Sequence, residues 1–238
     1  MKNEKNRIII FILVSLILVL GVIKINFVKE DKDDEKVTDA IKFKKEYESL
    51  NDKKSGDMTY PKVTLNDKNP FVYKSAKDIV NTLKSGTGII YLGFPKCPWC
   101  RNAVNILSYL NVDEIMYLNM TDQRDTYEVV DNILSKTKEG TKEYYEMLDI
   151  LDDILTPYEI EENGITYDTK EKRIYVPLVI GVKNGKIVGY HADTVNLKEG
   201  QTPFDLLDNS QKEELKKVYD DIKEKVYGDT CDINDKGC

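Results

Sequence analysis

The sequence has few of the residues that build the commonest catalytic and nucleic-acid-binding sites. Its 238 residues include a single histidine, and they contain no phosphate-binding loop, no HExxH zinc motif and no nucleophile elbow. Only four residues are arginine, which leaves few side chains able to grip a phosphate or carboxylate at two points. Acidic residues outnumber basic ones by 42 to 35, a formal net charge of -7. Nucleic acid is therefore not an expected partner.

Cysteine is also scarce, and its four copies fall in two close pairs. Four cysteines are too few to hold together a chain of this length, so the 41% hydrophobic residues must supply the core. The spacing favours redox chemistry or disulfides over packing. Cys231 and Cys238 enclose six residues near the C-terminal end, for which a structural disulfide is expected. A second redox pair or two free thiols are the alternatives.

The N-terminal end carries the one long apolar run. Residues 8–23 are apolar apart from Ser15 and Gly21, and Lys2, Lys5 and Arg7 precede them. This arrangement is typical of a secretory signal or a membrane anchor. Because no small-x-small cleavage site follows, residues 1–28 are predicted to be an uncleaved transmembrane anchor, with signal-peptide cleavage as the alternative. The short basic head favours a single-pass cell-membrane protein with an extracytoplasmic body.

Beyond the anchor, the pattern predicts one α/β domain with a mixed sheet flanked by helices. Residues 29–57 are a charged linker or a short helix, residues 58–227 form the domain, and residues 228–238 are a tail. Buried strands over 89–94 and 115–119 enclose a helix over 98–110, which is a parallel crossover unit.

The later part of the domain has different signals. Asn184-Gly185, between two apolar runs, predicts a β-hairpin. Ser210, with Glu213 three residues on, predicts the start of a final helix that runs to about residue 227. A helical pattern over 127–154 predicts a helical insertion at about 125–155.

The motif Cys97-Pro98-Trp99-Cys100 lies between a buried strand and a helix. A cysteine at a helix N-terminus has its thiolate stabilised by free N–H groups and the helix dipole, so the pKa of Cys97 is expected to be low. Pro98 suits the first helical position, and Lys96 adds a neighbouring positive charge. One helical turn brings Cys100 within reach of a mixed disulfide on Cys97.

Two other interpretations of the motif remain open, a structural zinc half-site and a static disulfide. Zinc needs two further ligands, for which the chain offers only His191 and the distant cysteine pair. His191 itself is interpreted as a strand-edge residue rather than a catalytic base. No metal and no other cofactor is expected.

At this point the chain resembles the thioredoxin superfamily over residues 58–227. The resemblance is carried by the strand, the CxxC helix, Val176-Pro177 and the following hairpin. It implies a thioredoxin-like fold, a cis-proline facing the cysteines, and a thiol-disulfide oxidoreductase in which Cys97 reacts first and Cys100 resolves. It further implies substrate docking at Trp99, Val176 and Pro177, although Trp99 could also only cap the surface. The family commonly keeps a buried carboxylate six residues before the first cysteine, where this chain has Tyr91.

With its anchor included, the chain is similar to membrane-anchored extracytoplasmic thioredoxin-like proteins of Gram-positive bacteria, among them the bacteriocin transport accessory type. This implies cysteine-containing secreted or membrane proteins or peptides as partners. The alternative is a thioredoxin-like accessory or binding protein for peptide export or maturation, with little redox turnover.

Overall fold

The computed structural model describes residues 37–228 of the chain. The predicted anchor at residues 1–28 and the pair Cys231 and Cys238 lie outside these described residues. Within the described part, no helix is both long enough and apolar enough to cross a membrane.

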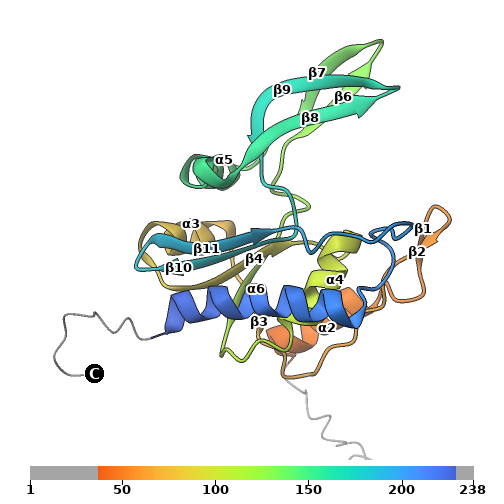
Figure 1. Cartoon of the computed structure of the whole chain (residues 1–238). Helices are drawn as coiled ribbons and strands as arrows, with labels where there is room; N and C mark the ends of the chain where they lie inside the picture. Colours follow the sequence, from red (N-terminus) through yellow and green to blue (C-terminus); the bar gives the residue numbers. More distant parts are fainter. Residues whose placement is uncertain (1–36, 229–238) are drawn as a thin grey trace, which may run out of the picture. The chain divides into compact units, whose positions relative to one another are not determined.

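A five-stranded mixed sheet forms the centre of the domain (Figure 1). Its strand order is β11-β10-β4-β5-β3, in which β3, β4 and β5 are parallel and β10 is antiparallel to both of its neighbours. The expected α/β class with a mixed sheet is therefore confirmed. The strands are β3 (Phe71–Tyr73), β4 (Gly88–Gly93), β5 (Ile115–Asn119), β10 (Leu178–Lys183) and β11 (Lys186–Ala192).

Helices cover both faces of this sheet, so its central strand is buried on both sides. Along β4, Ile89 and Tyr91 point into one core, while Ile90 and Leu92 point into the other, as alternation along a strand requires. The first core is closed by α2 (Asp39–Glu48), α4 (Pro98–Leu107) and α6 (Asn209–Tyr227), and the second by α3 (Ala76–Ser85) and α5 (Lys142–Ile150).

The domain begins earlier than the sequence predicted. Residues 29–57 were expected to be a charged linker or a short helix, and they contain the short helix α2. This helix is part of the domain and not a spacer. Its Phe43 and Tyr47 are fully buried, and the Phe43 and Phe71 rings stack with centroids 3.9 Å apart. The compact unit accordingly starts at Thr38 instead of near Met58. A short two-stranded ribbon, β1 (Lys54–Ser55) and β2 (Met58–Thr59), follows α2.

The helical insertion predicted at 125–155 is wrong for its first half. That half is a β-hairpin, because Asp131 and Asn132 both adopt positive φ angles, 51° and 61°, and turn the chain back on itself. Only α5 and a short 3-10 turn, η1 (Asp152–Ile154), are helical. The hairpin consists of β6 (Thr126–Val130) and β7 (Ile133–Lys138).

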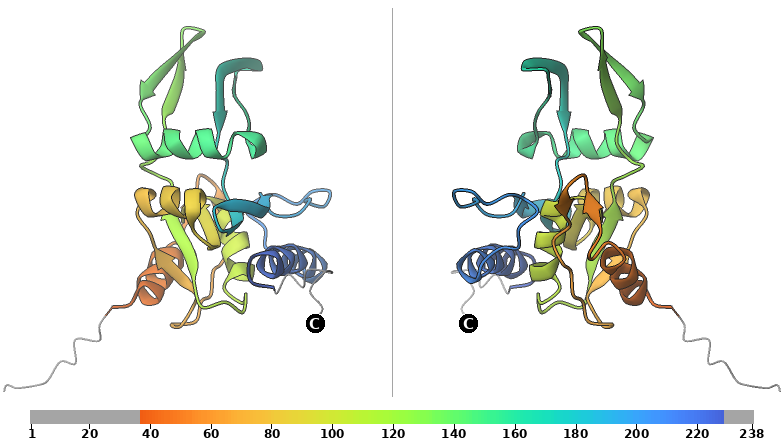
Figure 2. Two further views of the ribbon diagram at one scale, coloured as in Figure 1. Left: turned by 90° about the vertical axis from the view of Figure 1, so that its left-hand side faces the viewer. Right: turned by 90° about the vertical axis from the view of Figure 1, so that its right-hand side faces the viewer.

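A second hairpin follows, turning at Asn163-Gly164, and both hairpins lie on the far side of α5 from the sheet (Figure 2). We call these two hairpins the arm. The Tyr167 hydroxyl donates to the Asn132 side-chain oxygen at 3.3 Å, which joins their tips. The second hairpin consists of β8 (Thr156–Glu162) and β9 (Ile165–Arg173).

Two sequence signals near the end of the domain had different outcomes. The hairpin at Asn184-Gly185 is confirmed, with φ angles of 52° and 73°. A side chain at Gly185 would lie 2.3 Å from the Lys84 carbonyl oxygen, so glycine is required there. The predicted capping box at Ser210 is two residues late, because Asp208 caps α6 and pairs with Gln211.

A buried ion pair fixes the base of the arm. Arg173, at the end of β9, donates to the Asp125 carboxylate at 2.9 Å, just before β6. Only 12% of the Arg173 side chain and 2% of the Asp125 side chain are exposed. The Arg173 guanidinium also lies 4.0 Å above the Tyr158 ring. The pair therefore connects the two hairpins at their base, next to the rest of the domain.

We expect Asp125→Asn to lower the free energy of unfolding by about 3 kcal/mol, because it leaves a buried guanidinium without its counter-charge. Denaturant unfolding followed by circular dichroism measures the change. The matched control is Asp168→Asn, which breaks the exposed Lys170–Asp168 pair in the same arm and should have little effect. Equal losses in the two variants would show that the Arg173–Asp125 pair has no special role.

Candidate functional site

The Cys97-Pro98-Trp99-Cys100 motif lies where β4 ends and α4 begins. Cys97 is the N-cap of α4, and its sulfur accepts a hydrogen bond from the Cys100 N–H at 3.2 Å. Pro98 occupies the first helical turn, where no donor is lost. Cys97 is thus held where the backbone N–H groups of a helix converge, the position at which a sulfur anion is stabilised.

A segment far along the chain faces this cysteine. The Cys97 thiol points to the Val176 carbonyl oxygen at 3.6 Å, although 79 residues separate them. The Val176-Pro177 peptide bond is cis, and Pro177 is buried at the start of β10. Cys97, Val176 and Pro177, chosen from sequence as members of one site, are therefore neighbours in the structure.

The two cysteines differ strongly in their surroundings, although both are thiols. The pKa of Cys97 is lowered by hydrogen bonds from the Cys100 thiol and from the N–H groups of Cys100 and Trp99, against the opposing effect of burial. The pKa of Cys100 is raised well above its usual value, first by burial and then by the neighbouring Cys97. Of the two thiols, Cys97 therefore ionises more readily, whereas burial favours the protonated form of Cys100.

A positive charge that acts on Cys97 comes from Arg124. Lys96 is exposed, and within residues 37–228 it makes no hydrogen bond or ion pair. Arg124 follows β5, and its guanidinium lies 5.1 Å from the centre of the Phe94 ring, three residues before Cys97. Its charge lowers the pKa of Cys97. Sequence reasoning missed Arg124, because only folding brings the end of β5 beside the end of β4.

Trp99 is half-buried beside a surface cavity of about 550 Å³. The loop after β11 forms the other wall of this cavity, where a His191 ring nitrogen is hydrogen-bonded to the Thr194 carbonyl oxygen at 2.6 Å. The strand position expected for His191 is confirmed, since it lies near the end of β11. The cavity thus lies beside Trp99, two residues after Cys97.

Aromatic hydroxyls lie under Cys100. Tyr91 is fully buried, and its hydroxyl is 3.0 Å from the Tyr47 hydroxyl and 3.5 Å from the Cys100 carbonyl oxygen. The sequence marked Tyr91 as an unusual residue at its position. Tyr47 was missed, because it belongs to α2, which the sequence placed outside the domain.

A fully buried arginine joins α4 to α2. The Arg101 guanidinium donates to the Tyr47 and Pro61 carbonyl oxygens and to the Asn51 side-chain oxygen, each at 2.7 Å. Among the described residues it has no carboxylate partner, and burial lowers its pKa. The residue directly after Cys100 is thereby fixed to the C-terminal end of α2.

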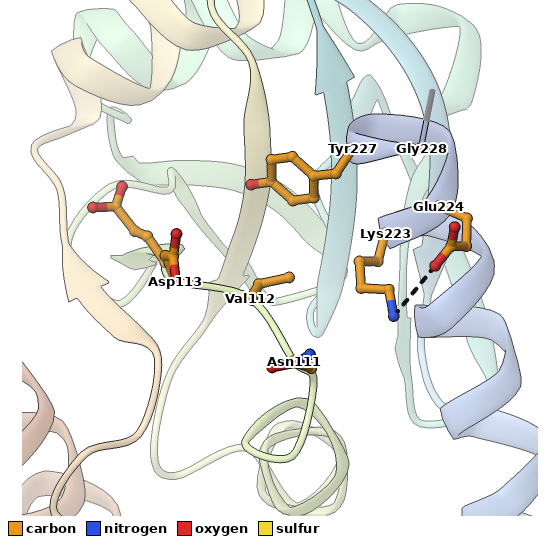
Figure 3. A pocket seen from close by; sticks show the side chains of 8 residues that line it. Asn111, Val112, Asp113, Lys223, Glu224, Tyr227 and Gly228 are labelled. Atoms are coloured by element: carbon orange, nitrogen blue, oxygen red, sulfur yellow. Dashed lines mark ion pairs between the residues drawn. The ribbon is translucent and has the colours of Figure 1, made fainter. Parts of the chain in front are cut away.

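Another cavity, of about 590 Å³, lies at the opposite end of the sheet (Figure 3). It is lined by residues 111–114, just before β5, and by the end of α6, including Tyr227. The cysteines follow the carboxyl end of β4, so this cavity is not part of their site. Within residues 37–228, no cluster of three or more histidine, cysteine or acidic side chains is placed to hold a metal ion.

We expect Arg124→Gln to raise the pKa of Cys97, because the thiolate loses a stabilising positive charge. The thiolate absorbance of the reduced protein, followed against pH, measures this shift, and alkylation of Cys97 at neutral pH should slow accordingly. Cys231 and Cys238 are replaced by serine to keep the signal specific. Lys96→Gln removes an equal charge and should leave the titration unchanged. An unchanged pKa in Arg124→Gln, or an equal shift in both variants, would contradict the assignment.

No family model, no curated protein and no solved structure matches this chain.

Proposed function

We propose that this chain is a thioredoxin-like thiol-disulfide oxidoreductase that acts through Cys97 and Cys100. The observation that carries the proposal is the placement of the Cys97 sulfur. It caps α4, accepts the Cys100 N–H and faces the carbonyl oxygen that precedes a cis-proline. The pKa of Cys97 is lowered and that of Cys100 is raised. A static structural disulfide does not require its two thiols to differ in this way, whereas thiol-disulfide exchange requires one thiol of low pKa and one that stays protonated.

The reaction follows from the different surroundings of the two sulfurs. The Cys97 thiolate attacks a substrate disulfide, forms a mixed disulfide and expels one substrate sulfur as a thiolate. Cys100 then loses its proton and attacks the Cys97 sulfur, which closes the Cys97–Cys100 disulfide and releases the second substrate sulfur. Two electrons pass from the cysteine pair to the substrate, and the reverse sequence oxidises a dithiol.

The proposed docking surface surrounds the one sulfur that reacts first. Val176 and Pro177 lie against Cys97, and Trp99 borders the neighbouring cavity. A polypeptide placed there can present its cysteine to Cys97 while its other side chains contact Trp99. The partners we propose are cysteine-containing secreted or membrane proteins or peptides, met outside the cytoplasm by a domain held at the membrane through residues 1–28.

A second candidate is a thioredoxin-like accessory protein for peptide export or maturation with little redox turnover. The arm favours it, because the hairpin tips carry the exposed apolar side chains of Val130, Ile133 and Ile165, away from the cysteines. One variant separates the two functions. Cys97→Ser should abolish the oxidoreductase function and leave the accessory function intact.

We expect Cys100→Ala to accumulate mixed disulfides between Cys97 and its partners, because the resolving thiol is gone. Cells that make the full-length protein are quenched with acid and alkylated, and the adducts are resolved on non-reducing gels. Cys231 and Cys238 are replaced by serine, so every adduct reports on Cys97. These adducts should collapse on reduction.

The matched control carries Cys97→Ser together with Cys100→Ala and should yield no adducts. Absence of adducts from Cys100→Ala itself, with the protein present at its normal level, would refute the oxidoreductase proposal. Because this control has no cysteine left, an adduct counts as a mixed disulfide of Cys97 only when the control lacks it.

A further inference from the structure

The step that the cysteines alone do not explain is the ionisation of Cys100. Cys100 is fully buried, and burial raises the pKa of its thiol well above the usual value. Its sulfur must nevertheless become a thiolate to attack the mixed disulfide. The main causes of the pKa shift of Cys100 include no carboxylate. The groups that lower this pKa are the Phe94 backbone N–H and the Tyr91 side chain.

The Tyr91 hydroxyl is placed to do this. Tyr91 projects from β4 beneath Cys100, and its hydroxyl donates to the Cys100 carbonyl oxygen at 3.5 Å. The Tyr91 hydroxyl also forms a hydrogen bond with the Cys100 side chain that lowers the pKa of the thiol. Gly93, two residues along the strand on the same side, leaves the necessary space, because a side-chain carbon there would lie 2.3 Å from that hydroxyl. Alanine at residue 93 would therefore displace the hydroxyl from beneath Cys100.

Tyr47 orients this hydroxyl. The Tyr47 and Tyr91 hydroxyl oxygens are 3.0 Å apart, and both side chains are fully buried. Burial raises the pKa of each tyrosine well above its usual value, so both keep their protons at neutral pH. Because Tyr91 donates its one proton to Cys100, Tyr47 is the donor in the bond between the two hydroxyls. The Tyr47 carbonyl, in turn, is held by Arg101.

We propose that Tyr91, oriented by Tyr47, donates a hydrogen bond to the Cys100 sulfur as it becomes a thiolate and so speeds the resolving step. This inference rests on the proposed function. Tyr91 keeps its own proton and is a donor, not a base. The proton of Cys100 passes through solvent to the departing substrate thiolate, the Cys97–Cys100 bond forms, and the bond between Cys97 and the substrate sulfur breaks.

Other groups around Cys100 titrate or carry charge and must be kept apart from Tyr91. They come from four other elements and the segment after β5, and they are Tyr47 on α2, Cys97 at the start of α4, Tyr117 on β5, Arg124 after β5 and Tyr219 on α6. Tyr219 is the matched control. Its buried hydroxyl also faces Cys100 but has no hydrogen-bond partner among the described residues.

The experiment follows both thiols in one reaction. The reduced protein, with Cys231 and Cys238 replaced by serine, is mixed with dithiobis-nitrobenzoate. Attack by Cys97 releases a first thionitrobenzoate, and attack by Cys100 on the resulting mixed disulfide releases a second. The rate of the second release is measured against pH for the parent protein and for Tyr91→Phe, Tyr47→Phe and Tyr219→Phe.

We expect Tyr91→Phe to slow the second release at neutral pH about tenfold and to move its pH profile upward, as loss of one hydrogen bond to a charged group predicts. Tyr47→Phe should slow it by a smaller factor. Tyr219→Phe should match the parent, and the first release should be unchanged in all three variants. The double variant Tyr47→Phe with Tyr91→Phe removes both hydroxyls, so neither remains buried and unpaired. Its second release should be as slow as that of Tyr91→Phe.

A second release that is as fast in Tyr91→Phe and in the double variant as in the parent would overturn the proposal. So would an equal slowing in Tyr219→Phe, because it would point to packing alone. Near-ultraviolet circular dichroism confirms that each variant keeps its tertiary structure. Failure of the parent itself to release a second thionitrobenzoate would instead refute the proposed exchange function.

Discussion

The hydrogen bonds of Arg101 are the constraint on which the site depends. A guanidinium is costly to bury, and here the hydrogen bonds that it makes within residues 37–228 go only to neutral oxygens. These come from α2, from the segment that follows it, and from the segment before Cys97. The Tyr47 carbonyl lies in the last turn of α2, where the helix dipole favours a cation. The directional bonds therefore fix α2 against α4 in one arrangement. Because Arg101 follows Cys100 directly, they also fix the second cysteine.

That arrangement explains why the two cysteines differ in pKa although only two residues lie between them. Cys97 lies at the N-terminal end of α4, where backbone N–H groups and Arg124 stabilise a negative charge. Cys100 lies one turn inside, against β4 and the aromatic side chains that α2 contributes. Burial keeps its proton in place and raises its pKa. The helix cap and the buried aromatic core thus shift the pKa values of the two thiols in opposite directions, and the order of attack that we propose follows from this difference.

The sequence predicted those features that depend on residues close together in the chain. The cap at Cys97, the Asn184-Gly185 turn and the short buried strands are local, and they are found where expected. The arm was mistaken for helix, since the left-handed backbone at Asp131 and Asn132 leaves little trace in hydrophobic spacing. Arg124, Tyr47 and Arg101 were missed for another reason, which is that their importance lies in contacts across the fold. Tyr91 stood out in the sequence as a residue that differs from the carboxylate common at this position in the thioredoxin superfamily. Its partner, the Tyr47 hydroxyl, could not be predicted.

A redox titration measures whether Cys97 and Cys100 form the reversible redox pair that we propose. The full chain, with Cys231 and Cys238 replaced by serine, is equilibrated in glutathione buffers of graded potential and acid-quenched. Its disulfide content is read by mass spectrometry, and the fluorescence of Trp99, the single tryptophan, is followed in parallel. The account predicts one reversible two-electron transition in which both signals change together. Thiols that stay reduced across the whole range, or a disulfide that no buffer in the series opens, would contradict it.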